Sequence, residues 1–176
     1  MVMFVRKKAA RFWAWYERYY VLNVGIAVVL FLWQLVHLYW LGADVIAQRL
    51  TETSFFPLNA FWRTLIVLVD YSEIPAIITT SLVYINELRK QFRWNPLILL
   101  LMLNSQWRHL FWITDEFVIH TFLGEPHGGT VLQVWLAWVA ILIDYLELPV
   151  IFDIVRRLLR ALRQGSGLEF IRKEMR

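Results

Sequence analysis

The sequence contains no cysteine among its 176 residues. This absence excludes disulfide bonds, thiolate metal sites and cysteine nucleophiles. The chain also lacks a Walker loop, the GxSxG and HExxH motifs and a dinucleotide-binding fingerprint, so nothing favours a nucleotide enzyme or a hydrolase with a catalytic triad. We expect no cleavable signal peptide, because the first apolar run is too long for a signal core.

Charged residues are missing from long parts of the chain. No Asp, Glu, Lys or Arg occurs in the 23 residues from Tyr19 to Leu41, which suffices to cross a hydrocarbon core of about 30 Å. The chain is 59% hydrophobic and 16% aromatic, and is therefore far more apolar than soluble domains. We expect an all-α integral membrane protein with four transmembrane helices, near residues 19–46, 59–88, 95–122 and 130–161.

The basic residues are distributed unevenly around these four spans. Fifteen of the 18 Lys and Arg fall on one side of the membrane, which by the positive-inside rule places both termini in the cytoplasm. Basic clusters beside spans contact anionic lipid, so the lipid bilayer is the expected partner and nucleic acid is not. Arg108 lies within the third span, seven residues before Asp115, with which it could pair. Residues 1–176 should form a single membrane domain, with a cytoplasmic basic tail at 165–176.

Two polar motifs each occur twice. QLVHLYWLGAD at 34–44 returns as QWRHLFWITDE at 106–116, and DYSEIPAI at 70–77 returns as DYLELPVI at 144–151. The offsets are 72 and 74 residues, so the chain reads as one helical hairpin written twice. Because each unit has an even number of spans, the copies share one orientation. We therefore predict a four-helix bundle of two tandem parallel-repeat hairpins, a first half near 19–90 and a second half near 91–164.

The repeated motifs place six titratable side chains at one depth of the bundle. Residues three apart share a helix face, so each DxxE presents two carboxylates, and the histidines come from the other two helices. Four carboxylates at the bilayer centre would cost roughly 10–14 kcal/mol, which two divalent ions would offset. The predicted metal ligands are His37, Asp70, Glu73, His109, Asp144 and Glu147.

This ligand inventory resembles that of the ferritin-like di-iron and di-manganese carboxylate proteins. That family holds two histidines and four carboxylates inside a four-helix bundle, with ExxH on one helix, where this chain has DxxE. The resemblance covers the six ligands alone and implies two divalent metal ions. Carboxylate and imidazole ligands favour iron or manganese and are compatible with zinc. The expected function is redox chemistry on O₂ or on a lipid-soluble substrate such as a quinone or acyl chain.

Side chains beside the predicted ligands suggest supporting roles. Gln34 and Gln106 precede the histidines by three residues and would orient a ligand through hydrogen bonds. Tyr71 and Tyr145 would donate hydrogen bonds or relay an electron during catalysis. The prolines two residues after each glutamate remove a helical N–H, which predicts a kink beside the site.

Other functions are compatible with the same polar residues. A cation or proton transporter would use Asp44 and Glu116 as entry steps and Asp153 further inward, since intramembrane acids often mark ion pathways. A b-type haem held by His37 and His109 would leave the DxxE pairs unexplained. A structural subunit would use the polar layer only to hold helices together. A homo-oligomer is compatible with each of these functions.

Overall fold

The computed structural model describes residues 2–53, 55, 59–114 and 134–163, and all regular structure in these segments is helical. The prediction of an all-α protein is therefore confirmed for the described residues. The helices follow the chain as α1 (Val2–Arg18), α2 (Tyr20–Trp40), the π-helical turn η1 (Leu41–Ile46), α3 (Ala47–Thr51), α4 (Ala60–Tyr71), α5 (Glu73–Lys90), α6 (Trp94–Ile113), α8 (Val134–Tyr145) and α9 (Glu147–Arg163).

Two helical stretches in the described part are long and apolar enough to cross a membrane. They cover Tyr20–Thr51, with 32 residues, and Thr64–Lys90, with 27 residues, and they overlap the first two expected spans. The first stretch runs past residue 46 because η1 and α3 continue α2 without a break. The third and fourth expected spans are described only in part, because residues 115–133 lie outside the described segments.

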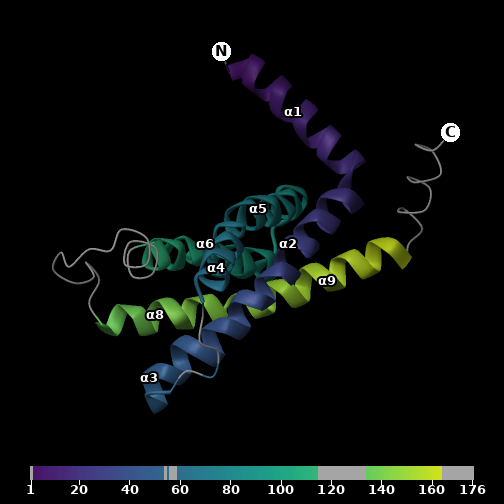
Figure 1. The fold of residues 1–176 in the computed structure, drawn as a ribbon. Coiled ribbons are helices and arrows are strands. Elements are labelled where there is room, and N and C mark those ends of the chain that lie inside the picture. The colour runs from purple at the N-terminus through teal and green to yellow at the C-terminus, as the bar shows by residue number, and fades with distance from the viewer. Residues whose placement is uncertain (1, 54, 56–58, 115–133, 164–176) are drawn as a thin grey trace.

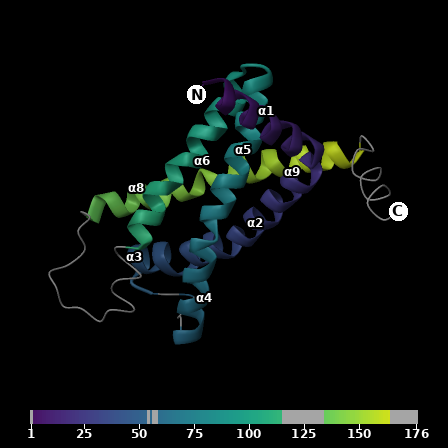
Figure 2. The ribbon, with the colours of Figure 1, turned by 90° about the horizontal axis from the view of Figure 1, so that it is seen from above.

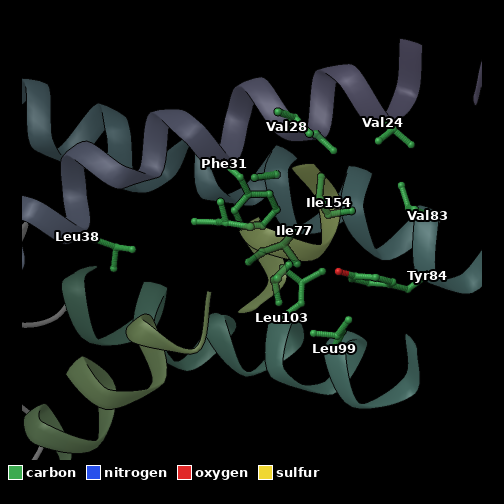
Figure 3. Packing of buried hydrophobic residues seen from close by; sticks show 14 of the residues in the cluster. Val24, Val28, Phe31, Leu38, Ile77, Val83, Tyr84, Leu99, Leu103 and Ile154 are labelled. Atoms are coloured by element: carbon green, nitrogen blue, oxygen red, sulfur yellow. The ribbon is translucent and has the colours of Figure 1, made fainter. Parts of the chain in front are cut away.

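Helices from distant parts of the sequence pack together around a common core. α2 contacts α4, α5 and α9, while α6 contacts α5, α8 and α9, and Figures 1 and 2 show α2, α5, α6 and α9 crossing near the centre of the molecule. Fully buried apolar side chains from these four helices meet there, among them Phe31, Ile77, Leu103 and Ile154 (Figure 3). The core therefore joins the two sequence halves directly.

Two helices are interrupted beside the repeated acidic motif. Ser72 alone separates α4 from α5, and Leu146 alone separates α8 from α9. Pro75 and Pro149 are the third residues of α5 and α9, and their missing N–H groups prevent regular helical bonding across each break. The N–H of Leu146 bonds to the carbonyl of Ile143 at 2.9 Å. The interruptions lie where the kinks were predicted, and each places the aspartate and glutamate of one DxxE on separate helices; a bend at either position stays a prediction.

Candidate metal centre

All six predicted ligands are buried in the interior of the helical assembly. Their relative exposure is 2% or less, and they come from six different helices. The histidines lie on α2 and α6, the aspartates near the ends of α4 and α8, and the glutamates at the starts of α5 and α9. Six buried titratable groups need partners of opposite charge or hydrogen bonds to offset their lost hydration.

His37 lies between carboxylates from two other helices. Its Nε2 atom is 3.0 Å from Oδ2 of Asp144 on α8, and its Nδ1 atom contacts Oδ1 of Asp70 on α4. Asp70 belongs to the first half of the chain and Asp144 to the second. The imidazole therefore connects the two halves through both of its ring nitrogens.

His109 completes a compact group with His37 and Asp144. Its Nε2 atom is 3.7 Å from Oδ1 of Asp144, and the two imidazole rings meet edge to face with centroids 5.1 Å apart. One ligand atom from each of the three residues lies within 4.8 Å of the others. Two imidazole nitrogens and a carboxylate oxygen at this spacing could hold a metal ion.

The remaining carboxylates lie beside this group with incomplete hydrogen bonding. Glu73 and Glu147 are close enough for each to act on the other's charge. Among the described residues, no N–H or hydroxyl group donates a hydrogen bond to Oδ2 of Asp70, Oε1 of Glu73 or either carboxylate oxygen of Glu147. Buried polar atoms without partners are rare and call for an explanation such as a bound ion. These oxygens could serve as further ligands if a cation binds there.

The two glutamines position the aspartates through the main chain. Gln34 Nε2 donates to the carbonyl of Val69 at 2.9 Å, and Gln106 Nε2 donates to the carbonyl of Ile143 at 2.8 Å. Each carbonyl belongs to the residue immediately before the aspartate of its DxxE motif. The predicted hydrogen-bonding role is thus present, but it acts on the backbone that carries each aspartate and not on an imidazole or carboxylate.

The two tyrosines lie beside the centre, and their hydroxyls bond across to neighbouring helices. Tyr71 Oη is 2.8 Å from Oγ1 of Thr114, which donates in turn to the carbonyl of Leu110 at 2.7 Å. Tyr145 Oη donates to the carbonyl of Leu38 at 3.4 Å. Neither of these bonds involves a predicted metal ligand. A catalytic role for Tyr71 and Tyr145 therefore stays a prediction.

An aromatic ring covers each histidine. Trp40 lies 5.6 Å from the His37 ring centroid, and Trp112 lies 5.4 Å from that of His109. Trp40 also donates its indole N–H to Oδ2 of Asp44 at 3.0 Å. Asp44 is therefore engaged with the indole, and Glu116, its counterpart as an entry step, lies outside the described residues.

A separate ionic cluster, missed by the sequence reasoning, lies toward the other end of α5 and α9. Arg157 contacts Asp153 on its own helix and Glu87 on α5, and its guanidinium lies 5.3 Å from the Tyr84 ring centroid. Asp153, which the sequence placed on an ion pathway, is thus part of an ion pair. Its spacing of four residues from Arg157 was the available signal.

Comparisons of the chain with protein-family models, with curated proteins and with solved structures found no match. The likeness to di-iron carboxylate proteins therefore stays a prediction based on the ligand inventory. A function for this chain has to be argued from the geometry of the buried site.

Proposed function

We propose that this chain is an integral membrane protein whose buried His/carboxylate layer binds two divalent metal ions, iron or manganese, for redox chemistry on O₂ or a lipid-soluble substrate. The observation that carries the proposal is the group formed by His37, His109 and Asp144, surrounded by carboxylate oxygens without hydrogen-bond partners in the described part. A cation there would supply the missing partners and offset the buried negative charge.

The distribution of apolar residues supports insertion in a membrane. The core of the protein holds charged and amide side chains, whereas its surface carries many large apolar ones. On α2 and α6 these include Leu22, Ile26, Val29, Leu32, Val36, Ile98, Leu101 and Phe111. Soluble monomers rarely expose contiguous apolar patches of more than a few hundred Å². We infer that α2 to α3, α4–α5, α6 and α8–α9 are the four spans, with both termini on the cytoplasmic side.

The helix contacts support a parallel repeat. α2 packs on α4 and α5 of its own half and on α9 of the other, while α6 packs on α8 and α9 of its own half and on α5 of the other. The three contacts of α2 therefore correspond one to one with the three contacts of α6 when the two halves are exchanged. A pseudo-two-fold axis along the membrane normal would relate such halves, and the metal centre would lie close to that axis.

The donor set determines what each side chain would do. His37, His109 and Asp144 would bind one ion, and Glu73 and Glu147 would bind a second ion with Asp70 shared or terminal. Such a pair of ions supplies one-electron steps at a site with hard oxygen and imidazole ligands. The protein itself would hold the ligands on six rigid helices and exclude water from the centre.

Haem ligation and ion transport are less well supported than a metal centre. Two axial histidines would not account for the four buried carboxylates, and two of these, on Asp70 and Asp144, face the ring nitrogens of His37. Asp153, the expected inward step of an ion pathway, is paired with Arg157, which also contacts Glu87. These contacts satisfy a group that a conducting path would need to leave open.

Elemental analysis of purified protein tests the proposal directly. The wild type should contain about two equivalents of iron or manganese, and a His37→Ala/His109→Ala double variant should lose them. Thr80→Val is the matched control, because Thr80 is fully buried on α5 but is not a predicted ligand, and it should keep the metal. A metal-free wild type produced with ample metal, or a double variant with unchanged metal content, would contradict the proposal, whereas a Soret band would indicate haem.

A further inference from the structure

A groove opens on the outer surface of the second half, between α6 and α8. These helices lie side by side (Figure 2) and enclose a cavity of about 390 Å³. Its lining includes Trp107, Arg108, Phe111, Trp112, Ala140 and Ile143. The volume lies within the range of small-molecule sites, about 300–1,000 Å³.

The inner wall of this groove is also a wall of the metal centre. Trp112 lines the groove and is 5.4 Å from the ring centroid of His109. Ile143, on the opposite wall, immediately precedes Asp144, and its carbonyl accepts the hydrogen bond from Gln106. A molecule in the groove would therefore be separated from the centre by a single layer of side chains.

The residues that line the groove differ between the two halves. The offset of 74 pairs Ala140 with the larger Ile66, which is 2% exposed. The offset of 72 pairs Arg108 with the apolar Val36. The second half thus has a smaller side chain at the base of the groove and a positive charge at its edge.

Arg108 is unusual for its depth. It lies 11 residues after Leu97, where the apolar run of α6 begins, so it lies about 16 Å into a hydrocarbon core of about 30 Å. Its side chain is exposed and forms no ion pair with any residue that the structure describes; Asp115, its predicted partner, lies outside those residues. Arginine at the centre of a membrane helix is costly, and an acceptor on a bound molecule would offset that cost.

We propose that this groove binds a quinone, with a ring carbonyl oxygen accepting a hydrogen bond from Arg108 and the ring packed among Trp107, Phe111 and Trp112. The inference rests on the proposed membrane insertion and names the lipid-soluble substrate of the same centre. Aromatic walls favour a flat conjugated ring through offset or edge contacts. Phospholipid headgroups stay at the membrane surface, whereas a quinone carries carbonyl acceptors on a ring that enters the hydrocarbon region.

Binding of a short-chain ubiquinone analogue to the full chain in lipid nanodiscs tests this proposal. Ala140→Ile introduces the residue of the first half and should weaken binding by filling the groove. Arg108→Val removes the charged donor and should weaken binding roughly 10- to 100-fold, with partial recovery in Arg108→Lys. Val36→Ile, at the equivalent surface position of the first half, is the matched control and should leave affinity unchanged.

Two further measurements separate this proposal from the metal proposal and from ordinary lipid binding. The His37→Ala/His109→Ala variant should still bind the quinone analogue, because the groove residues are intact, so loss of metal and loss of quinone are independent outcomes. Circular dichroism checks that each variant keeps its helices.

Unchanged quinone affinity in folded Arg108→Val would overturn the proposal. Equal competition by a saturated long-chain alcohol would also overturn it, because it would make the groove a site for acyl chains.

Discussion

The two halves of the chain share the glutamine and tryptophan contacts beside the buried centre, and they differ in residues on the outer surface. Gln34 bonds to the main chain of α4 as Gln106 bonds to that of α8, and the bond lengths are 2.9 and 2.8 Å. Trp40 and Trp112 cover the two histidines at 5.6 and 5.4 Å. On the outer side, however, the groove of the second half is lined by Arg108 and Ala140, where the first half has Val36 and Ile66.

This difference separates two requirements of the molecule. Residues that surround the shared centre must suit both halves at once, because both sets of ligands converge on it. Residues on the outer surface meet no such constraint, so one half can acquire a binding groove while the other keeps its packing. If the two halves are related by the proposed two-fold repeat, the repeat would account for the buried centre, and the residues that break it would be the first candidates for specificity.

The largest expected effect follows from unequal contacts of the two aspartates. Asp144 contacts both histidines, whereas Asp70 contacts only His37. Residues that only support metal ligands typically change metal affinity by roughly 10- to 100-fold when they are replaced. Asp144→Asn should weaken metal binding by more than this. Asp70→Asn should weaken it by less than Asp144→Asn does. Chelator competition on the two purified variants measures both affinities. Equal losses would show that the two halves contribute equally despite their different contacts.

A smaller but distinct effect is expected at the glutamates. Glu73 and Glu147 lie against each other and outside the group formed by His37, His109 and Asp144. A Glu73→Gln/Glu147→Gln variant should keep the first ion and lose the second, which lowers the metal content from about two equivalents to about one. Elemental analysis distinguishes this result from a single-ion site. With a single ion, the wild type would contain about one equivalent of metal, and the double variant would contain the same amount.

The sequence alone predicts the helical class and the gathering of the six ligands, for physical reasons. A run free of charge from Tyr19 to Leu41 and repeated polar motifs are strong local signals, and burial of all six ligands follows from placing them at one depth. The breaks at Ser72 and Leu146 were also predictable, because proline has a fixed effect on helices.

The contacts of these residues were less predictable than their burial. Nothing in the spacing of DxxE indicates that His37 would meet Asp144 of the other half as well as Asp70 of its own. The groove likewise combines residues of α6 and α8, such as Arg108 and Ala140, that come together only once these helices are packed. Long-range packing decides such contacts, and local spacing carries no record of it.

The tyrosine hydroxyls offer a third test of the comparison. Tyr71 makes a bond of 2.8 Å to Thr114, whereas Tyr145 makes a longer one of 3.4 Å to the carbonyl of Leu38. Tyr71→Phe should lower the free energy of unfolding by about 0.5–1.5 kcal/mol, and Tyr145→Phe should lower it less. Denaturant unfolding in detergent micelles, followed by circular dichroism, measures both. A redox role for either tyrosine would appear separately, as lost turnover in a variant with unchanged metal content.

The smallest expected effect concerns Gly42, which lies beside one tyrosine hydroxyl where the other half of the chain has a threonine. Gly42 occupies the position that Thr114 has in the second half, and a Cβ atom there would lie 3.1 Å from the Tyr145 hydroxyl. That hydroxyl is at the end of a side chain held by a long bond, so it can move by a few tenths of an ångström. Alanine favours helix over glycine by about 0.5–1 kcal/mol, so Gly42→Ala should be slightly stabilising. Thr114→Ala should be destabilising in the same unfolding assay, because it removes the hydrogen-bond partner of Tyr71. Opposite signs for the two variants would show that the tyrosine hydroxyls of the two halves have different hydrogen-bond surroundings.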